Sequence, residues 1–243
     1  MQNCRSAWPR GRDIGHSVRV MESGTRGELL ARLADAVGAV AIDHPTRVAV
    51  DGPPAAGKTT LGDELAVVLR SRGRDVIRAS IEGFLHPRAR RYARGELSPA
   101  GCYDDSFDYD ALHQVLLDPL GPDGDRRFQA AVYDKRADAA LSPALATAPA
   151  DAVLLFDGVF LLRPELVSSW DLRIFVSVAF ERTIARAQTR DGEQYGTTAV
   201  VHRWRSRYIP SQQMYLAAAR PTDHADVIVH NDEPQRPAWE VSA

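Results

Sequence analysis

The stretch DGPPAAGKTT, residues 51–60, determines the fold that this sequence predicts. It follows a short apolar run, RVAVD (47–51), and precedes KTTLGDELAVVLRSRG (58–73), whose apolar residues recur at helical spacing. Gly52 to Thr59 fit the pattern G-x-x-x-x-G-K-[ST] in the strand–loop–helix context that it requires. Glycine lets successive backbone amides point inward as an anion site, and the next helix adds its dipole. We therefore expect a phosphate-binding loop; the alternative is an ordinary turn rich in glycine and proline.

The loop carries side chains suited to a nucleoside triphosphate and Mg²⁺. Lys58 is placed to reach the β- and γ-phosphates, and the Thr59 hydroxyl is placed for the metal. A later apolar run, VLLFDG, supplies Asp157, a carboxylate that can hold Mg²⁺ directly or through water. The alternative for Asp157 is a residue that caps the next turn. The residues expected at the nucleotide are Gly52, Pro53, Pro54, Ala55, Ala56, Gly57, Lys58, Thr59 and Thr60.

The composition restricts the partners of the protein. Its 243 residues carry a net charge of −2, which gives no electrostatic case for nucleic-acid binding. No segment reaches about 18 consecutive apolar residues, so no membrane span is expected. The N-terminus lacks the apolar region of a signal peptide, and the two cysteines, Cys4 and Cys102, form no disulfide framework or zinc site. A reducing cytoplasm is the expected compartment. Monomer and homo-oligomer both stay open.

Strand patterns alternate with helical patterns along the chain. This alternation implies crossover connections and a parallel sheet with both faces covered. We expect an α/β fold of the P-loop NTPase type, a three-layer sandwich with a five-stranded parallel sheet and a small helical lid. The strands are predicted at 47–51, 75–80, 151–160, 171–178 and 225–231.

The length of the chain fits one compact domain with a small lid better than two full domains. We expect this domain at 25–233 with the lid near 190–200, a flexible arm at 1–24 and a tail at 234–243. Residues 82–110 have few apolar repeats and contain many Arg, Pro and Gly residues. They are therefore predicted to form a long functional loop.

Among proteins with a phosphate-binding loop, the sequence favours small-molecule kinases. The NKxD signature of guanine-specific GTPases is absent, and no LSGGQ-like transporter signature occurs. The chain is also too short for a motor core with additional modules. A phosphotransferase that acts on an alcohol group is therefore the expected class.

An ordered set of motifs resembles the uridine kinase family, within the phosphoribulokinase and uridine kinase group. The set consists of GPPAAGKTT, IEGF, YDDSFDYDAL, AVYD, VLLFDGVFLL, ARAQTRD and RYIPSQQMYL…ADVIV, in this order. It extends from about residue 46 to 231. FDYDAL and FDGVFLL at these separations are more specific than the phosphate-binding loop alone. The resemblance implies Mg²⁺-dependent transfer of the γ-phosphoryl group of ATP or GTP to a nucleoside 5′-hydroxyl.

The resemblance also implies the catalytic residues. Glu82, in IEGF, matches a family aspartate that acts as base toward the acceptor hydroxyl, and it reaches one methylene further. Arg186 and Arg190 lie four residues apart and match arginines that clamp the transferring phosphoryl group. Surface or loop charges are the alternative for all three. Tyr195 and Thr197 stand where the family lid has further arginines. The implied catalytic set is Lys58, Glu82, Arg186 and Arg190.

The substrate contacts that the resemblance implies are Phe84, His86, Tyr103, Asp108, Tyr133 and Asp138. Asp108 matches a carboxylate that holds ribose hydroxyls, and helix capping is its alternative. Phe84 matches an aromatic side chain beside the substrate, and core packing is its alternative. Tyr133 begins the YD motif near the base pocket. Asp138 and Ala140, however, stand where the family has His and Arg, which argues against uridine or cytidine specificity. Asp138 either binds a donor-bearing or cationic group or is a solvated loop residue.

A basic segment follows Glu82, with His86, Arg88, Arg90, Arg91 and Arg94. It forms either a rim that attracts a phosphorylated or acidic substrate, or a solvated loop that pairs with nearby acids.

Three functions therefore remain open at the level of sequence. The expected one is an ATP-dependent kinase for a nucleoside 5′-hydroxyl. A second is a kinase for another acceptor: a different nucleoside, pantothenate, a sugar phosphate or a natural product. The third is a regulatory protein that binds nucleotide without turnover.

Overall fold

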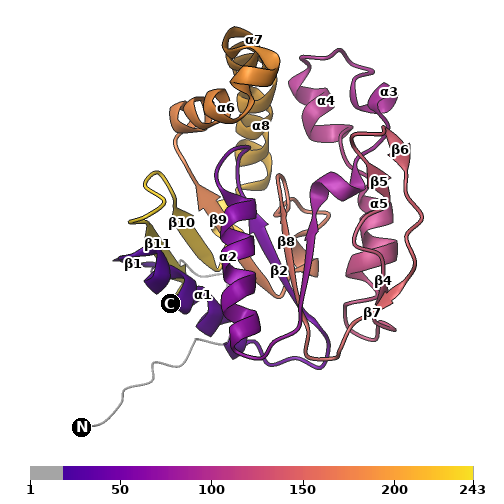
Figure 1. The fold of residues 1–243 in the computed structure, drawn as a ribbon, viewed down its shortest axis with the longest axis vertical. Coiled ribbons are helices and arrows are strands. Elements are labelled where there is room, and N and C mark those ends of the chain that lie inside the picture. The colour runs from indigo at the N-terminus through magenta and orange to yellow at the C-terminus, as the bar shows by residue number, and fades with distance from the viewer. Residues whose placement is uncertain (1–18, 243) are drawn as a thin grey trace.

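The computed structural model describes residues 19–242, which form a sheet covered by helices on both faces (Figure 1). The strands of the main sheet are β1 (Arg19–Ser23), β2 (Thr46–Asp51), β3 (Val76–Ser80), β8 (Val153–Gly158), β9 (Leu172–Ser177), β10 (Val227–His230) and β11 (Ala238–Ser242). The longer helices are α1 (Arg26–Ala39), α2 (Lys58–Ser71), α6 (Phe180–Tyr195), α7 (Thr197–Arg203) and α8 (Ile209–Ala219). None of the helices within residues 19–242 is long and apolar enough to cross a membrane.

The sheet has seven strands in the order β1-β11-β10-β9-β2-β8-β3. The five strands from β10 to β3 pair in parallel, as the alternating pattern predicts. β11 is antiparallel to β10, and β1 is antiparallel to β11. The expectation of a five-stranded sheet therefore holds for the parallel part and is wrong for the whole sheet.

The two additional strands come from the chain ends. Residues 19–23 fall in the expected flexible arm and residues 238–242 in the expected tail, yet they pair with each other along the sheet edge. Both strands are short, and β1 is half exposed, so their apolar signal is weak. Trp239 anchors the strand pair to the domain, since its side chain is buried in the core between the sheet and α1. Residues 1–18 lie outside the described residues.

Alternating residues of the central strands build two cores. Val48 and Val50 of β2 face α1 and α2, and Ala49 faces the opposite layer. The first turn of α1 is fixed by a capping box, in which the Thr25 hydroxyl accepts from Glu28 N and the Glu28 carboxylate accepts from Thr25 N. Each face of the sheet is therefore sealed by helices, which gives the expected three layers.

The long segment after β3 is structured by short elements. These are η1 (Ile81–Phe84), α3 (Arg88–Arg91), α4 (Pro99–Asp104), α5 (Tyr109–Leu112) and η2 (His113–Leu117). Two small antiparallel pairs follow, formed by β4 (Arg127–Phe128) with β7 (Ala146–Thr147) and by β5 (Tyr133–Asp134) with β6 (Ala139–Ala140). The remaining elements are η3 (Val167–Ser169), η4 (Trp204–Tyr208) and α9 (Pro221–His224).

The carboxyl ends of the parallel strands lie along one edge of the sheet. The loop between β2 and α2 begins at this edge, and Asp157 lies in register with Ser80 there. The helices α6 and α7 rise on one side of the loop, and α3 and α4 rise on the other (Figure 1). Ligands of open α/β sheets bind at this edge.

We expect Trp239→Ala to show that the terminal strand pair belongs to the domain. Trp239 is buried and donates from Nε1 to Glu22 at 2.9 Å. Loss of a buried tryptophan should lower the free energy of unfolding by about 3–5 kcal/mol. Met21→Ala is the control, because Met21 is 58% exposed on β1. Urea denaturation measures both, and equal stability of the two variants would contradict the prediction.

Candidate active site

The phosphate-binding loop is shaped by two glycines that contact neighbouring strands. Gly52 has φ 147°, and a Cβ there would overlap the Val176 carbonyl oxygen of β9. Gly57 has φ 90°, and a Cβ there would lie 2.8 Å from Asn231 Nδ2. Both conformations belong to the left-handed region that favours glycine. These close approaches fix the path of the loop and aim its backbone toward the edge of the sheet.

Lys58 lies at the start of α2 and is 8% exposed. Its Nζ donates to the Pro53 carbonyl oxygen at 2.8 Å, across the loop. Burial lowers the pKa of the Lys58 ammonium to about 8, against the opposing effect of Asp51, Asp157 and Glu82. Asp51 ends β2, Asp157 lies at the end of β8, and Glu82 follows β3, so all three carboxylates belong to the same edge of the sheet as Lys58.

Thr59 and Asp157 meet as the sequence predicts. Thr59 Oγ1 donates to Asp157 Oδ2 at 2.7 Å, and Arg78 Nη2 of β3 donates to Asp157 Oδ1 at 2.8 Å. Among residues 19–242, no group of three or more His, Cys, Asp or Glu side chains could hold a metal ion. One hydroxyl and one carboxylate fit Mg²⁺ that is held mainly by phosphates and water.

A fully buried carboxylate precedes the loop. Asp51 Oδ1 accepts from Gly52 N at 2.7 Å, and Oδ2 accepts from the Tyr215 hydroxyl of α8. The same hydroxyl accepts from Leu162 N at 2.9 Å. Burial raises the pKa of the Asp51 carboxyl, and the bonds from Tyr215 and Gly52 oppose this rise. The motifs of the sequence do not predict this pair, although an acid directly before the first loop glycine marks one half of it.

Arg186 lies beside the loop and contacts backbone carbonyl groups. It donates to the carbonyl oxygens of Ala56 at 3.3 Å, Asn231 at 2.6 Å and Asp232 at 3.1 Å. Asn231 also donates from Nδ2 to the Ala56 carbonyl oxygen at 2.7 Å. Arg186 therefore braces the loop in this structure. Asn231 was missed by sequence reasoning, although a polar residue at the end of the last parallel strand marks the position.

The other two predicted catalytic charges have partners in the structure. Glu82 is 61% exposed in η1, and its carboxylate lies 3.1 Å from Lys135 Nζ. Arg190 pairs with Asp191 at 2.7 Å, and the negative charge of Glu82 contributes to the raised pKa of Arg190 after the Asp191 hydrogen bond. Both side chains are 61% exposed, so Glu82 and Arg190 are accessible from solvent.

Phe84 is a correction to the predicted substrate contacts. It is fully buried in the core and packs 6.0 Å from Phe156, measured between ring centroids. With no exposed surface, this side chain packs into the core and offers no face to a ligand in this structure. The core-packing alternative therefore holds for Phe84.

His86, Tyr103 and Asp108 lie in the segment that runs from η1 to the start of α5. Asp108 caps α5, since Oδ1 accepts from Ala111 N at 2.9 Å, and Oδ2 lies 3.7 Å from His86 Nδ1. Burial, followed by the charge of Arg90, lowers the pKa of His86. The ring of Tyr103 packs on the aromatic core beside the segment. Capping is thus one role of Asp108, and its second oxygen faces His86.

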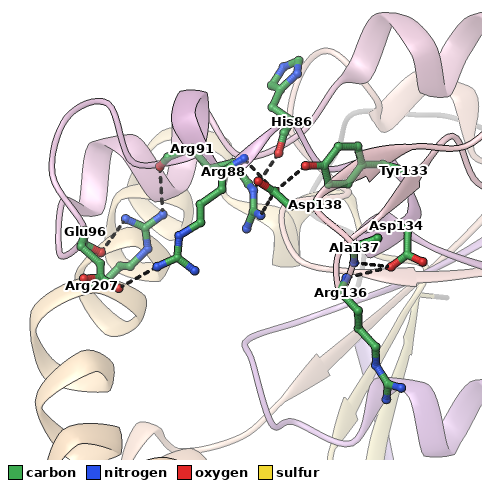
Figure 2. Close-up of polar contacts among 10 residues, drawn as sticks. All are labelled: His86, Arg88, Arg91, Glu96, Tyr133, Asp134, Arg136, Ala137, Asp138 and Arg207. Atoms are coloured by element: carbon green, nitrogen blue, oxygen red, sulfur yellow. Dashed lines mark hydrogen bonds and ion pairs between the residues drawn. The ribbon is translucent and has the colours of Figure 1, made fainter.

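Asp138 connects the β5–β6 pair to α3 (Figure 2). Its Oδ1 accepts from the Tyr133 hydroxyl at 2.5 Å, from Arg88 N at 3.0 Å and from Arg91 Nη2 at 3.3 Å. Arg207 of η4 donates in turn to the Arg91 carbonyl oxygen. The Tyr133 hydrogen bond lowers the pKa of Asp138 most, so the carboxylate is charged. A cavity of about 470 Å³ opens beside it, lined by Arg88, Ala89, Tyr92, Glu96 and Asp138.

Several solved structures share this architecture. A protein described as a possible uridine kinase from Bacillus stearothermophilus matches with a TM-score of 0.66 and 20% identity, over 83% of this chain and 97% of that one. A provisionally assigned fructose transport system kinase from a Silicibacter species matches with a TM-score of 0.65 and 25% identity, over 78% of this chain and 95% of that one. A D-glycerate 3-kinase from Cryptococcus neoformans matches with a TM-score of 0.54 and 16% identity, over 84% of this chain and 93% of that one. Neither a protein-family model nor a curated protein matches the chain.

These similarities define the class of fold. The chain has the α/β fold of P-loop kinases of the uridine kinase type, with a mostly parallel sheet. The resemblance carried by the sequence motifs is thereby confirmed at the level of the fold.

We expect the affinity for MgADP to fall as the pH rises above about 8, the pKa of Lys58. Bound phosphate raises this pKa, so binding takes up a proton at higher pH and weakens by up to about tenfold per pH unit. Below pH 8 the lysine is charged with or without ligand, and this contribution to the affinity is constant. Lys58→Arg should bind without this alkaline loss. Titration calorimetry from pH 6.5 to 9.5 measures the MgADP affinity. A wild-type affinity that does not change with pH would contradict the prediction.

We expect Asn231→Asp to damage the loop more than Asn231→Ala. The Asn231 amide is buried and donates to the Ala56 carbonyl oxygen. Alanine removes this bond, at a cost of about 1–3 kcal/mol, whereas aspartate places two acceptors against each other. Urea denaturation and MgADP titration should both rank wild type above alanine and alanine above aspartate. An aspartate variant as stable as wild type would show that this bond does not support the loop.

Proposed function

We propose that this protein is a Mg²⁺-dependent kinase that transfers the γ-phosphoryl group of ATP to a hydroxyl group of a small molecule. One observation carries the proposal. Lys58 at the start of α2, the Thr59–Asp157 pair and Glu82, two residues after β3, all follow or end strands at the carboxyl edge of a P-loop kinase fold, which supports a common role. GTP is the alternative donor. Other P-loop proteins share the first two features, and the exposed carboxylate of Glu82 is what suits attack by a hydroxyl group.

The residues divide the chemistry among them. Bound Mg²⁺ and ATP would supply the phosphoryl group and a cation at its oxygens, with Thr59 and Asp157 at the metal. The amides of the loop hold the phosphates, and Lys58 neutralises charge that develops during transfer. Glu82 accepts the proton of the attacking hydroxyl group at a carboxylate oxygen, which requires it to leave Lys135. Arg190 stabilises the equatorial oxygens once it releases Asp191.

We propose a nucleoside 5′-hydroxyl as the first acceptor to consider. The support is the ordered motif set shared with the uridine kinase family and the second oxygen of Asp108, which makes no helix cap and lies 3.7 Å from His86 Nδ1. A ribose diol suits a carboxylate that accepts two hydrogen bonds.

A specific observation favours a second acceptor class. Asp138 stands where the family reads a pyrimidine base, but its Oδ1 is occupied by Tyr133, Arg88 and Arg91. The lining of the neighbouring cavity includes the arginine Arg88 and the ring of Tyr92. Another nucleoside, pantothenate, a sugar phosphate or a natural product therefore remains the alternative acceptor. The internal pairs of Glu82 and Arg190 favour the third reading, nucleotide binding without turnover.

ADP release from MgATP tests the proposal. We expect one acceptor from a panel of nucleosides, pantothenate, glycerate and sugar phosphates to stimulate release at least tenfold over the acceptor-free rate. Lys58→Ala should abolish the stimulation. Glu82→Gln keeps the shape without the base and should lower kcat by about 10²–10⁴.

The controls separate the three readings. MgADP binding and thermal unfolding show whether each variant retains its fold. Stimulation by uridine or cytidine supports a nucleoside acceptor. Stimulation only by another member of the panel identifies that compound's class as the acceptor instead. MgADP binding without stimulation by any acceptor would contradict the kinase proposal and support nucleotide binding alone.

A further inference from the structure

Arg78 of β3 is hydrogen-bonded to Asp157, the carboxylate expected at the metal. Its Nη2 donates to Asp157 Oδ1 at 2.8 Å, while Thr59 donates to Asp157 Oδ2 at 2.7 Å. Both oxygens of Asp157 are therefore engaged. The two side chains are mostly enclosed, with 19% of Arg78 and 6% of Asp157 exposed. An enclosed pair of this kind is weakly screened by solvent.

The guanidinium of Arg78 is fixed from three directions. Besides Asp157, it donates from Nε to Asp63 at 2.9 Å and from Nη1 to the Leu155 carbonyl oxygen at 2.5 Å. Such a planar fork holds a carboxylate in a defined orientation, which a lysine ammonium does not. Arg78 is therefore a built part of the site and not a surface charge that happens to lie nearby.

Helix α2 is adapted to this guanidinium. Gly62 lies in the interior of α2, and a Cβ there would lie 2.9 Å from Arg78 Nη2. Glycine in a helix interior costs about 1 kcal/mol relative to alanine. At this position it leaves the space that the guanidinium needs to reach Asp157.

We propose that Arg78 is a positioning residue that makes metal binding depend on nucleotide. It orients the carboxylate of Asp157, and its positive charge offsets the negative charge that would attract Mg²⁺ to the nucleotide-free site. The metal then binds together with the phosphates. Asp157 and Thr59 would hold the metal, and Arg78 would keep the carboxylate oriented toward it. This inference rests on the proposed function, since it concerns the same metal site.

Binding of Mn²⁺ alone tests the charge effect without any turnover. Electron paramagnetic resonance measures free Mn²⁺ in the presence of nucleotide-free protein. We expect weak binding by wild type and at least about tenfold tighter binding by Arg78→Met, because one positive charge beside the carboxylate is removed. Arg78→Lys retains the charge and should bind Mn²⁺ as weakly as wild type. Unchanged Mn²⁺ affinity in a folded Arg78→Met variant would overturn the inference.

Titration with ADP in the presence and absence of Mg²⁺ tests the coupling. Arg78→Met should bind metal-free ADP more weakly, so the gain in affinity from Mg²⁺ should rise about tenfold above the wild-type gain. Gly62→Ala leaves every charge in place and displaces the guanidinium, so it should move both measurements in the same direction by a smaller factor. Identical gains in wild type and both variants would overturn the inference.

Two controls keep the outcomes distinct. Arg70→Met removes a positive charge at the far end of α2, where Arg70 donates to the Val76 carbonyl oxygen, and should change neither measurement. If Arg70→Met matches Arg78→Met, the effect reflects net charge and the inference fails. MgADP binding by wild type that requires Lys58 shows that the nucleotide site itself is present. Loss of that binding would instead contradict the proposed function.

Discussion

The loop at 51–60 is held so close to the neighbouring strands that only glycine fits at two of its positions. Gly52 lies against the backbone of β9, and Gly57 lies against Asn231 at the end of β10. The rest of the site depends on this constraint. It sets where α2 begins, and therefore where Lys58 enters the buried region and where Thr59 meets Asp157. The supporting residues secure the loop through its backbone. The site is thus formed by the central strands themselves, with little freedom in the placement of its charges.

The parallel sheet and the centre of the site follow from local patterns in the sequence. Apolar runs separated by helical patterns predict the five parallel strands. A loop motif between a strand and a helix predicts Lys58 and Thr59 where the helix begins. Asp157 follows the same logic, because strand ends of a parallel sheet meet at one edge. These features depend on short stretches of chain, and so one sequence suffices to predict them.

Other features depend on contacts between distant segments. Phe84 lies only two positions after Glu82 in the sequence, yet the turn of η1 directs Phe84 into the core and Glu82 to solvent. Asn231 and Tyr215 support the loop from positions more than 150 residues away in sequence. The pairing of charged residues, such as Glu82 with Lys135, is set by where the small β5–β6 pair folds back. No periodicity in the sequence reports such contacts.

The edge formed by β1 and β11 has a consequence for how the chain folds. Glu22 and Trp239 are 217 positions apart in sequence, so this edge closes the longest loop of the domain. Closing such a loop costs chain entropy before the contact is made, and contacts of this range form late. During folding, β10 has no neighbour on its outer side until residues 238–242 pair with it. An unpaired apolar edge is a template for wrong pairing. A partly folded chain in which β11 has not yet paired with β10 is therefore open to aggregation through this edge.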